Sequence, residues 1–274
     1  MAKIDRLGWA SGLSLTAYGV QIGVRINNTD AIDHLTQCFP PGWRLSDQAI
    51  VDRLYSIVVG DGGNERKRVR RFHLVYRDVS RLARTPDFEM ALASLESDMH
   101  LFIAEMSPRR VFVHAGVVGW KDKAIVIPGR TFTGKTTLVA ELVRAGATYY
   151  SDEYAVLDAR GRVHPFPRPL QIRDGTGRQQ KQSVEMIGGR AGKKPLTISL
   201  VISSRYRSGA TWRPRVLSLG RGMQEMLSNT VSARRQPEMV LTTLKKSLAQ
   251  ARLLKSVRGE ARQIVDAVLR YLDQ

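Results

Sequence analysis

Cysteine is nearly absent from this chain, and long apolar runs are missing altogether. Cys38 is the one cysteine among 274 residues, which excludes an internal disulfide framework and is typical of a reducing compartment. No apolar run approaches the roughly 18 residues that cross a membrane, and the amino-terminal residues are not followed by the apolar segment of a signal peptide. We therefore expect a soluble, cytoplasmic protein that has no membrane partner.

Negative charge is scarce as well. Lys and Arg number 43 against 25 Asp and Glu, which gives a formal net charge of +18. Such an excess is typical of proteins that bind anions, nucleic acids included. The basic residues are spread along the chain, however, and aromatic residues do not alternate with them as a stacking platform for nucleic acid requires. We favour a solvated basic face over a nucleic-acid site, which stays open as an alternative.

The first 108 residues show apolar patterning but no recognisable chemistry. Alternating apolar residues predict strands within 11–27 and at 72–76. The run Thr85-Pro86-Asp87 predicts the start of a helix that extends to Met106, with a capping hydroxyl, a proline in the first turn and an acidic group near the positive end of the dipole. We interpret residues 1–108 as a small α+β region that docks a substrate or supports assembly.

Residues 109–274 begin with a strand–turn–strand pattern and end in helices. Two strands are predicted at 111–119 and 124–127, and a helix follows that Gly146 ends. Together the two regions predict an α/β fold that is α+β over the whole chain. The remaining elements are predicted as strands at 196–203 and 212–217 and helices at 221–228, 237–249 and 260–272.

The most informative stretch is a strand, a glycine-bounded loop and the first turn of a helix. It fits G-x-x-x-x-G-K-[ST] from Gly129 through Thr136. The two glycines let backbone N–H groups turn inward on an anion, and the positive end of the helix adds to that attraction. Lys135 supplies a charge for the β- and γ-phosphates, and the Thr136 hydroxyl is suited to Mg²⁺. The predicted ATP site consists of Gly129, Arg130, Thr131, Phe132, Thr133, Gly134, Lys135, Thr136 and Thr137.

Three further segments, one before this loop and two after it, contain candidate catalytic residues. His114 lies on the strand before it, the adjacent acids Asp152 and Glu153 follow its helix, and a run that ends in Arg173 comes later. This order resembles the catalytic domain of the HPr kinase/phosphorylase family, whose P-loop core resembles that of phosphoenolpyruvate carboxykinase. The resemblance covers roughly residues 110–230, and it implies a P-loop kinase core within a domain at 109–274.

The resemblance also implies a role for each matching residue. Asp152 falls on the carboxylate that accepts the proton of the substrate hydroxyl, and Glu153 falls on the one that, with Thr136, holds Mg²⁺. His114 falls on the histidine that assists the first carboxylate, and Arg173 aligns with the arginine of the later segment. An oligomer, here a homo-oligomer, is suggested by the same resemblance.

The chain departs from the family at three positions. Phe132 replaces a glycine, Glu153 replaces an aspartate, and Gln171 stands in place of a glutamate. The first 105 residues do not match the family's usual amino-terminal domain, so we expect a substrate other than HPr.

Independently of the family, adjacent carboxylates beside a phosphate loop are able to divide metal binding and proton transfer between them. We therefore predict an ATP- and Mg²⁺-dependent kinase that phosphorylates a serine or threonine hydroxyl of a protein or peptide. The alternatives are a small-molecule kinase of the same fold and a nucleotide-dependent regulatory module that contacts nucleic acid.

Overall fold

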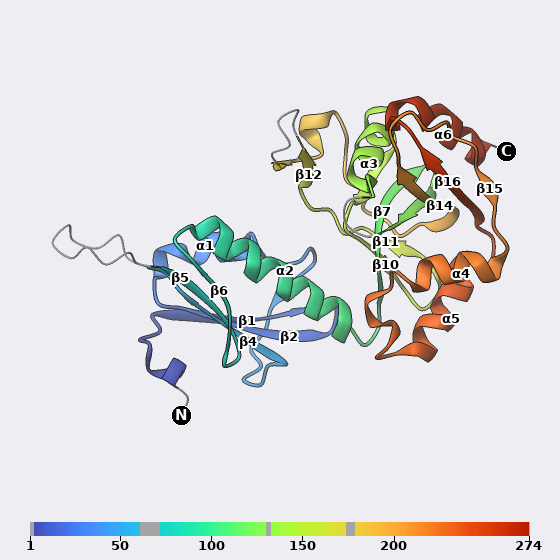
Figure 1. The fold of residues 1–274 in the computed structure, drawn as a ribbon. Helices are drawn as coiled ribbons and strands as arrows, with labels where there is room; N and C mark the ends of the chain where they lie inside the picture. The colour runs from blue at the N-terminus through green and yellow to red at the C-terminus, as the bar shows by residue number, and fades with distance from the viewer. Residues whose placement is uncertain (1–2, 61–71, 130–132, 174–178, 274) are drawn as a thin grey trace. The chain divides into compact units, whose positions relative to one another are not determined.

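The chain divides into two compact units, Met1–Pro108 and Arg109–Gln274, and each is described here by itself (Figure 1). The computed structural model describes residues 3–60, 72–129, 133–173 and 179–273. These residues form sheets and six α-helices, so the predicted α+β class is confirmed. None of the described helices is both long enough and apolar enough to span a bilayer.

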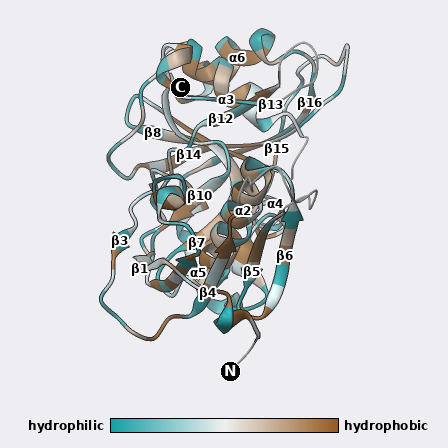
Figure 2. Ribbon diagram, turned by 90° about the vertical axis from the view of Figure 1, so that its left-hand side faces the viewer, coloured by the Kyte–Doolittle hydropathy of each residue, from teal (hydrophilic) through white to brown (hydrophobic). Residues whose placement is uncertain are grey.

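The first unit is built on a six-stranded sheet in the order β3-β1-β2-β4-β5-β6. The predicted alternation is present in β2, where alternate side chains are buried. The edge strand β6 is mostly hydrophilic, as its teal colour in Figure 2 shows. The elements are β1 (Ser11–Ala17), β2 (Val20–Ile26), α1 (Ile32–Thr36), β3 (Arg44–Leu45), β4 (Arg53–Val58), β5 (His73–Arg77), β6 (Ser80–Thr85), α2 (Phe88–Met106) and the 3-10 turns Lys3–Arg6 and Thr29–Ala31.

The long helix α2 covers this sheet, and its start differs slightly from the prediction. Leu95, Met99 and Ile103 of α2 are buried in one apolar cluster with the side chains of β1, β2 and β4. The carboxylate of Asp87 caps the helix, because it accepts hydrogen bonds from the backbone N–H groups two and three residues further along the chain. The Thr85 hydroxyl instead accepts the N–H of Asp87 at 3.1 Å. The helix therefore begins one residue after Asp87, the residue predicted to open it.

The second unit is built on a larger mixed sheet in the order β11-β10-β7-β8-β14-β16-β15, and β9 also pairs with β7. Strands β8, β14 and β16 run parallel, whereas β7 runs antiparallel to β8. A separate hairpin joins β12 to β13. The strands are β7 (Val111–Trp120), β8 (Lys123–Pro128), β9 (Thr148–Ser151), β10 (Tyr154–Leu157), β11 (Val163–His164), β12 (Leu170–Arg173), β13 (Gln179–Gln182), β14 (Thr197–Tyr206), β15 (Arg215–Val216) and β16 (Arg252–Arg258).

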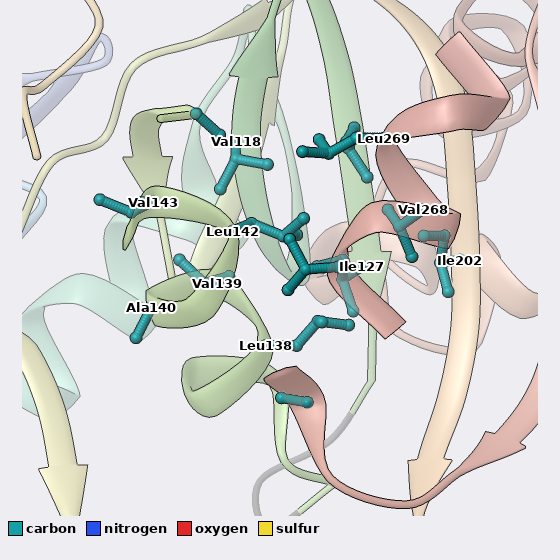
Figure 3. Close-up of a cluster of buried hydrophobic side chains, with 14 of the residues drawn as sticks. Val118, Ile127, Leu138, Val139, Ala140, Leu142, Val143, Ile202, Val268 and Leu269 are labelled. Carbon is teal, nitrogen blue, oxygen red and sulfur yellow. The ribbon is translucent and has the colours of Figure 1, made fainter. Parts of the chain in front are cut away.

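Helices cover both faces of this sheet (Figure 1). One face packs against α3 and α6, and the other packs against α4 and α5. Leu138 and Leu142 of α3 contact the apolar side chains of β8 and α6, such as Ile127 and Val268 (Figure 3). The helices are α3 (Lys135–Arg144), α4 (Leu219–Leu227), α5 (Pro237–Leu248) and α6 (Val265–Asp273), with 3-10 turns at Glu185–Ile187, Val231–Ala233 and Ala261–Ile264.

Strand β16 is the one long strand of this sheet for which the sequence patterns make no prediction. Leu253 and Leu254 are both buried, and they belong to the apolar clusters on opposite faces of the sheet. A strand buried on both faces lacks the apolar–polar alternation by which strands are recognised. The missing prediction of β16 matters for the site, because this strand ends beside the phosphate loop.

A buried carboxylate closes the hairpin between β10 and β11. Asp158 is 5% exposed and accepts the backbone N–H groups of Arg160 at 2.9 Å and Arg162 at 3.0 Å. Its second oxygen lies 2.9 Å from Nε2 of His164 and 3.0 Å from Nη2 of Arg162. Burial alone would raise the pKa of Asp158, but the hydrogen bonds from His164, Arg162 and Arg160 outweigh it and hold the pKa at about 2.

Asp158→Asn should lower the free energy of unfolding by about 1–2 kcal/mol at pH 7. Because the folded pKa is depressed, the contribution of the carboxylate is complete above about pH 4 and is lost as the pH falls toward the folded value. Urea unfolding between pH 7 and pH 3 should therefore show the difference shrinking toward acid. Asp122→Asn, at an exposed turn, is the control and should change little. A difference that is independent of pH would contradict this account.

Candidate functional site

The glycine-bounded loop joins β8 to α3, so the predicted strand and helix on its two sides are confirmed. Gly129 follows β8, and its N–H donates to the carbonyl of His114 at 3.1 Å. Gly134 is the N-cap of α3 and has φ of +83°, a left-handed conformation that favours glycine. A Cβ at Gly129 would lie 2.8 Å from Oγ1 of Thr133, so this position also needs glycine. Arg130, Thr131 and Phe132 lie outside the described residues.

The acid pair lies where the chain passes from β9 into β10. Both strands pair with β7, which is itself the neighbour of β8. The Ser151 hydroxyl accepts the N–H groups of Glu153 at 3.1 Å and Tyr154 at 2.9 Å, which fixes the turn. The N–H of Ala115 on β7 donates to the carbonyl of Glu153 at 3.1 Å. The sheet thus brings the acids to the end of β8 from which the phosphate loop starts.

Asp152 is in direct contact with the first turn of α3. The Thr136 hydroxyl donates to Oδ2 of Asp152 at 3.3 Å. The Tyr149 hydroxyl lies 3.1 Å from Oδ1 of Asp152 and 2.8 Å from the carbonyl of Arg168. Burial raises the pKa of Asp152, although the hydrogen bonds from Tyr149 and Thr136 oppose that shift. A carboxylate that is costly to ionise therefore faces the loop.

Glu153 is held by a cation that the sequence patterns did not indicate. Arg168, in the stiff segment between Pro167 and Pro169, forms an ion pair with Glu153 through Nη1. The side chain of Arg168 is 13% exposed and that of Glu153 is 32% exposed. Arg168 also weakly favours the charged form of Asp152. The alternating prolines around Arg168 predict a stiff, extended segment, but they do not show which carboxylate pairs with the arginine.

Lys135 and His114 complete the charged part of the site. Burial lowers the pKa of Lys135, and the charges of Asp152 and Glu153 oppose that shift. Burial, followed by the charge of Lys135, lowers the pKa of His114, which favours the neutral imidazole near pH 7. The His114 ring packs against Tyr154 with centroids 4.8 Å apart. The fold thus brings Lys135, Thr136, Asp152, Glu153 and His114 to the same end of the sheet.

Two other predicted residues are less central in the structure. Arg173 is the last residue of β12, but its side chain lies outside the described part of the chain. Thr137 lies in the first turn of α3 and is exposed. Tyr149, which contacts Asp152, was not predicted as a site residue. The adjacent tyrosines Tyr149 and Tyr150 are evident in the sequence, but only the strand register decides which of the two side chains faces Asp152.

The oxygen atoms at the start of α3 suit Mg²⁺. The described residues contain no group of three or more His, Cys, Asp and Glu side chains that could hold a metal ion. Mg²⁺ needs fewer protein ligands than three, because it is commonly held by one or two carboxylates together with substrate phosphates and waters. The Thr136 hydroxyl beside the Asp152 carboxylate is such a donor set. Glu153, the predicted ligand, forms an ion pair with Arg168.

Comparison of this sequence with protein-family models and with curated protein sequences finds no match. Function is therefore inferred from the chemistry of the loop and of the acids beside it.

Tyr149→Phe should raise the pKa of Asp152 further, because it removes a hydrogen bond that stabilises the charged carboxylate. The fold should lose about 1 kcal/mol of stability. NMR titration of the labelled carboxyl carbon would measure the first effect, and chemical unfolding the second. Tyr150→Phe is a matched control, since the Tyr150 hydroxyl donates to the carbonyl of Lys194 at 2.7 Å. An equal change in Asp152 titration in both variants would contradict the predicted contact.

Proposed function

We propose that this protein is an ATP- and Mg²⁺-dependent kinase of the HPr kinase-like type, which phosphorylates a serine or threonine hydroxyl of a protein or peptide. The observation that carries the proposal is the contact between the two halves of the site. The hydroxyl of Thr136, in the phosphate loop motif, donates to Asp152 of the acid pair at 3.3 Å. Phosphoryl transfer needs a phosphate cradle and a proton acceptor within a few ångströms of each other.

The loop would hold the triphosphate through backbone N–H groups at the start of α3 and through Lys135. Burial makes this cation more effective, because the medium around it screens charge less than water does. Thr136 is the residue that would hold Mg²⁺, together with Glu153 once Arg168 releases it. When bound, Mg²⁺ neutralises part of the charge on the transferred phosphoryl group.

Asp152 is the residue proposed to accept the proton of the substrate hydroxyl. Its raised pKa makes it a stronger base than an exposed aspartate, whose pKa is about 4. The neutral His114, whose pKa the charge of Lys135 helps to lower, is proposed to assist this step. Arg173, which aligns with the arginine of the family's later segment, is proposed as a further catalytic residue. Arg168 would keep the second acid oriented while the site is empty of substrate.

The charge of the chain is divided unequally between the two units, which bears on the acceptor. Residues 1–108 contain thirteen basic and thirteen acidic residues, whereas residues 109–274 contain thirty basic and twelve acidic ones. The second unit thus carries the whole net charge of +18. Such a field attracts anionic partners and raises their association rate. We infer an acidic protein or peptide as acceptor, with the neutral first unit available for docking or for assembly into a homo-oligomer.

The same charge asymmetry supports a second candidate, a nucleotide-dependent module that contacts nucleic acid through residues 109–274. Turnover separates the two. A kinase consumes ATP in proportion to phosphorylated acceptor, whereas the module would show slow turnover and a nucleic-acid affinity that falls steeply with salt.

Lys135→Ala should remove most of the ATP affinity or turnover, on the order of 10²-fold or more, because Lys135 is the cation that the loop motif itself provides for the phosphates. Calorimetric titration with ATP and Mg²⁺ would measure this in a folded variant. Lys121→Ala, at the exposed turn between β7 and β8, is the control and should bind ATP normally. Normal ATP binding by a folded Lys135→Ala protein would disprove the nucleotide site.

Asp152→Asn should leave ATP affinity within about threefold but lower turnover by a factor on the order of 10²–10⁴, the usual contribution of a general base. Glu153→Gln should instead weaken the response to Mg²⁺. Steady-state phosphorylation at several Mg²⁺ concentrations separates the two effects. If Asp152→Asn turns over normally while Glu153→Gln is inactive with intact metal binding, the roles are reversed. If neither substitution has an effect, the protein is not a kinase of this type.

A further inference from the structure

A buried arginine lies directly against the phosphate loop. Arg258 ends β16 and is only 1% exposed. Its Nη2 donates to the carbonyl of Gly134 at 2.6 Å, and its Nη1 donates to the carbonyl of Gly259 at 3.0 Å. Its Nε has no hydrogen-bond partner among the described residues. This side chain was not predicted as part of the site, because β16 itself was not predicted.

The charge of Arg258 is not balanced by an ion pair. Buried arginines are ordinarily paired with a carboxylate, since an isolated charge in the interior is costly. Within the described part of the chain, no carboxylate lies within ion-pair distance of Arg258. The closest candidate, Glu260, is exposed and accepts the hydroxyl of Tyr206 at 2.8 Å. Burial lowers the pKa of the guanidinium, and the charge of Glu260 opposes that shift only in part.

The contact with Gly134 fixes the orientation of one peptide group. The Gly134 carbonyl also accepts the N–H of Leu138 at 3.2 Å, so two donors hold it on the helix side. The carbonyl and the N–H of a trans peptide point in opposite directions. The N–H of Lys135, which shares this peptide with Gly134, is therefore turned away from Arg258 toward the loop. The N–H groups at the start of a helix are those that bind phosphate.

Space around the contact is closed to any larger residue. A Cβ at Gly134 would lie 2.5 Å from Nη2 of Arg258. The N–H of Tyr206, at the end of β14, donates to the carbonyl of Thr133 at 3.4 Å. The ends of β14 and β16 thus form the back of the loop, opposite the side on which Asp152 contacts Thr136.

We propose that Arg258 is a second cation of the polyphosphate site, which holds the Gly134–Lys135 peptide toward the anion and whose charge is balanced by the bound phosphates. This inference depends on the proposed nucleotide site and adds a binding residue to it. It explains why a charge without a carboxylate partner is buried at this position, where a neutral side chain would cost the fold less. Arg258 acts through the backbone of the loop, so it is a positioning residue.

The test uses the full chain and inorganic tripolyphosphate as the probe, with ATP in parallel. Arg258→Met should bind tripolyphosphate about tenfold more weakly than the unaltered protein, because the buried charge beside the phosphates is lost. Arg258→Lys keeps the charge but loses the paired hydrogen bonds, so its affinity should lie between those of the unaltered protein and Arg258→Met. Arg252→Met removes an exposed arginine at the other end of β16 and should bind normally. Calorimetry measures the affinities, and thermal unfolding without ligand monitors the fold.

The difference between the methionine and lysine variants decides the question. A role in the fold alone would lower the thermal stability of both variants and leave tripolyphosphate affinity unchanged, which would overturn the inference. Equal losses of affinity in both variants would also overturn it, because charge would then be irrelevant. If the methionine variant does not fold, Arg258→Gln, which keeps hydrogen-bond donors without the charge, takes its place. A loss of about tenfold in tripolyphosphate affinity supports the proposal, and an unchanged affinity overturns it.

Failure of the underlying nucleotide site would look different. In that case the unaltered protein would bind neither tripolyphosphate nor ATP, and the variants would show no further loss of affinity. Normal binding by the unaltered protein with normal binding by Arg258→Met would overturn only the role of Arg258.

Discussion

The site depends on charges of both signs that the second unit removes from water at one end of its sheet. Burial opposes the charge of Lys135, and the charges of Asp152 and Glu153 partly offset that cost. Burial also opposes the charge of Asp152, and the hydrogen bonds from Tyr149 and Thr136 partly offset it. Arg168 offsets Glu153 in the same way. Such an arrangement adds little to stability, since buried ion pairs roughly recover their desolvation cost. Its value lies in charge that acts at close range on a bound polyphosphate, where water screens it least.

The packing of α3 against the sheet makes this arrangement possible. Gly116 on β7 lets the helix approach closely, because a Cβ there would lie 2.5 Å from Cγ2 of Val139. The apolar face of α3 is buried against β8 and α6 (Figure 3). Thr136 is thereby held within hydrogen-bond distance of Asp152, and the loop is anchored at both of its ends. The apolar core thus sets the spacing between the cradle for the phosphates and the acid beside it.

Local chemistry made part of this fold predictable, and long-range pairing made the rest unpredictable. The loop, the strand before it and the helix after it follow from glycine, lysine and apolar spacing within about twenty residues. Strand β16 could not be assigned, because its adjacent Leu253 and Leu254 are buried on opposite faces and break the apolar–polar alternation. Arg258 and Arg168 reach the site from segments distant in the sequence, so only the strand order shows which groups they meet. The resemblance implies that Glu153 holds the metal, and the structure adds that it forms an ion pair with Arg168 while Asp152 contacts Thr136.

The central claim is that the phosphate loop and the acid pair act on one bound nucleotide. A crystal structure of the unaltered chain with Mg²⁺ and a non-hydrolysable ATP analogue would test it most directly. We expect the triphosphate at the start of α3, with Lys135 on the β- and γ-phosphates and the Asp152 carboxylate facing the terminal phosphate. A nucleotide bound elsewhere, or a terminal phosphate that points away from Asp152, would contradict the account.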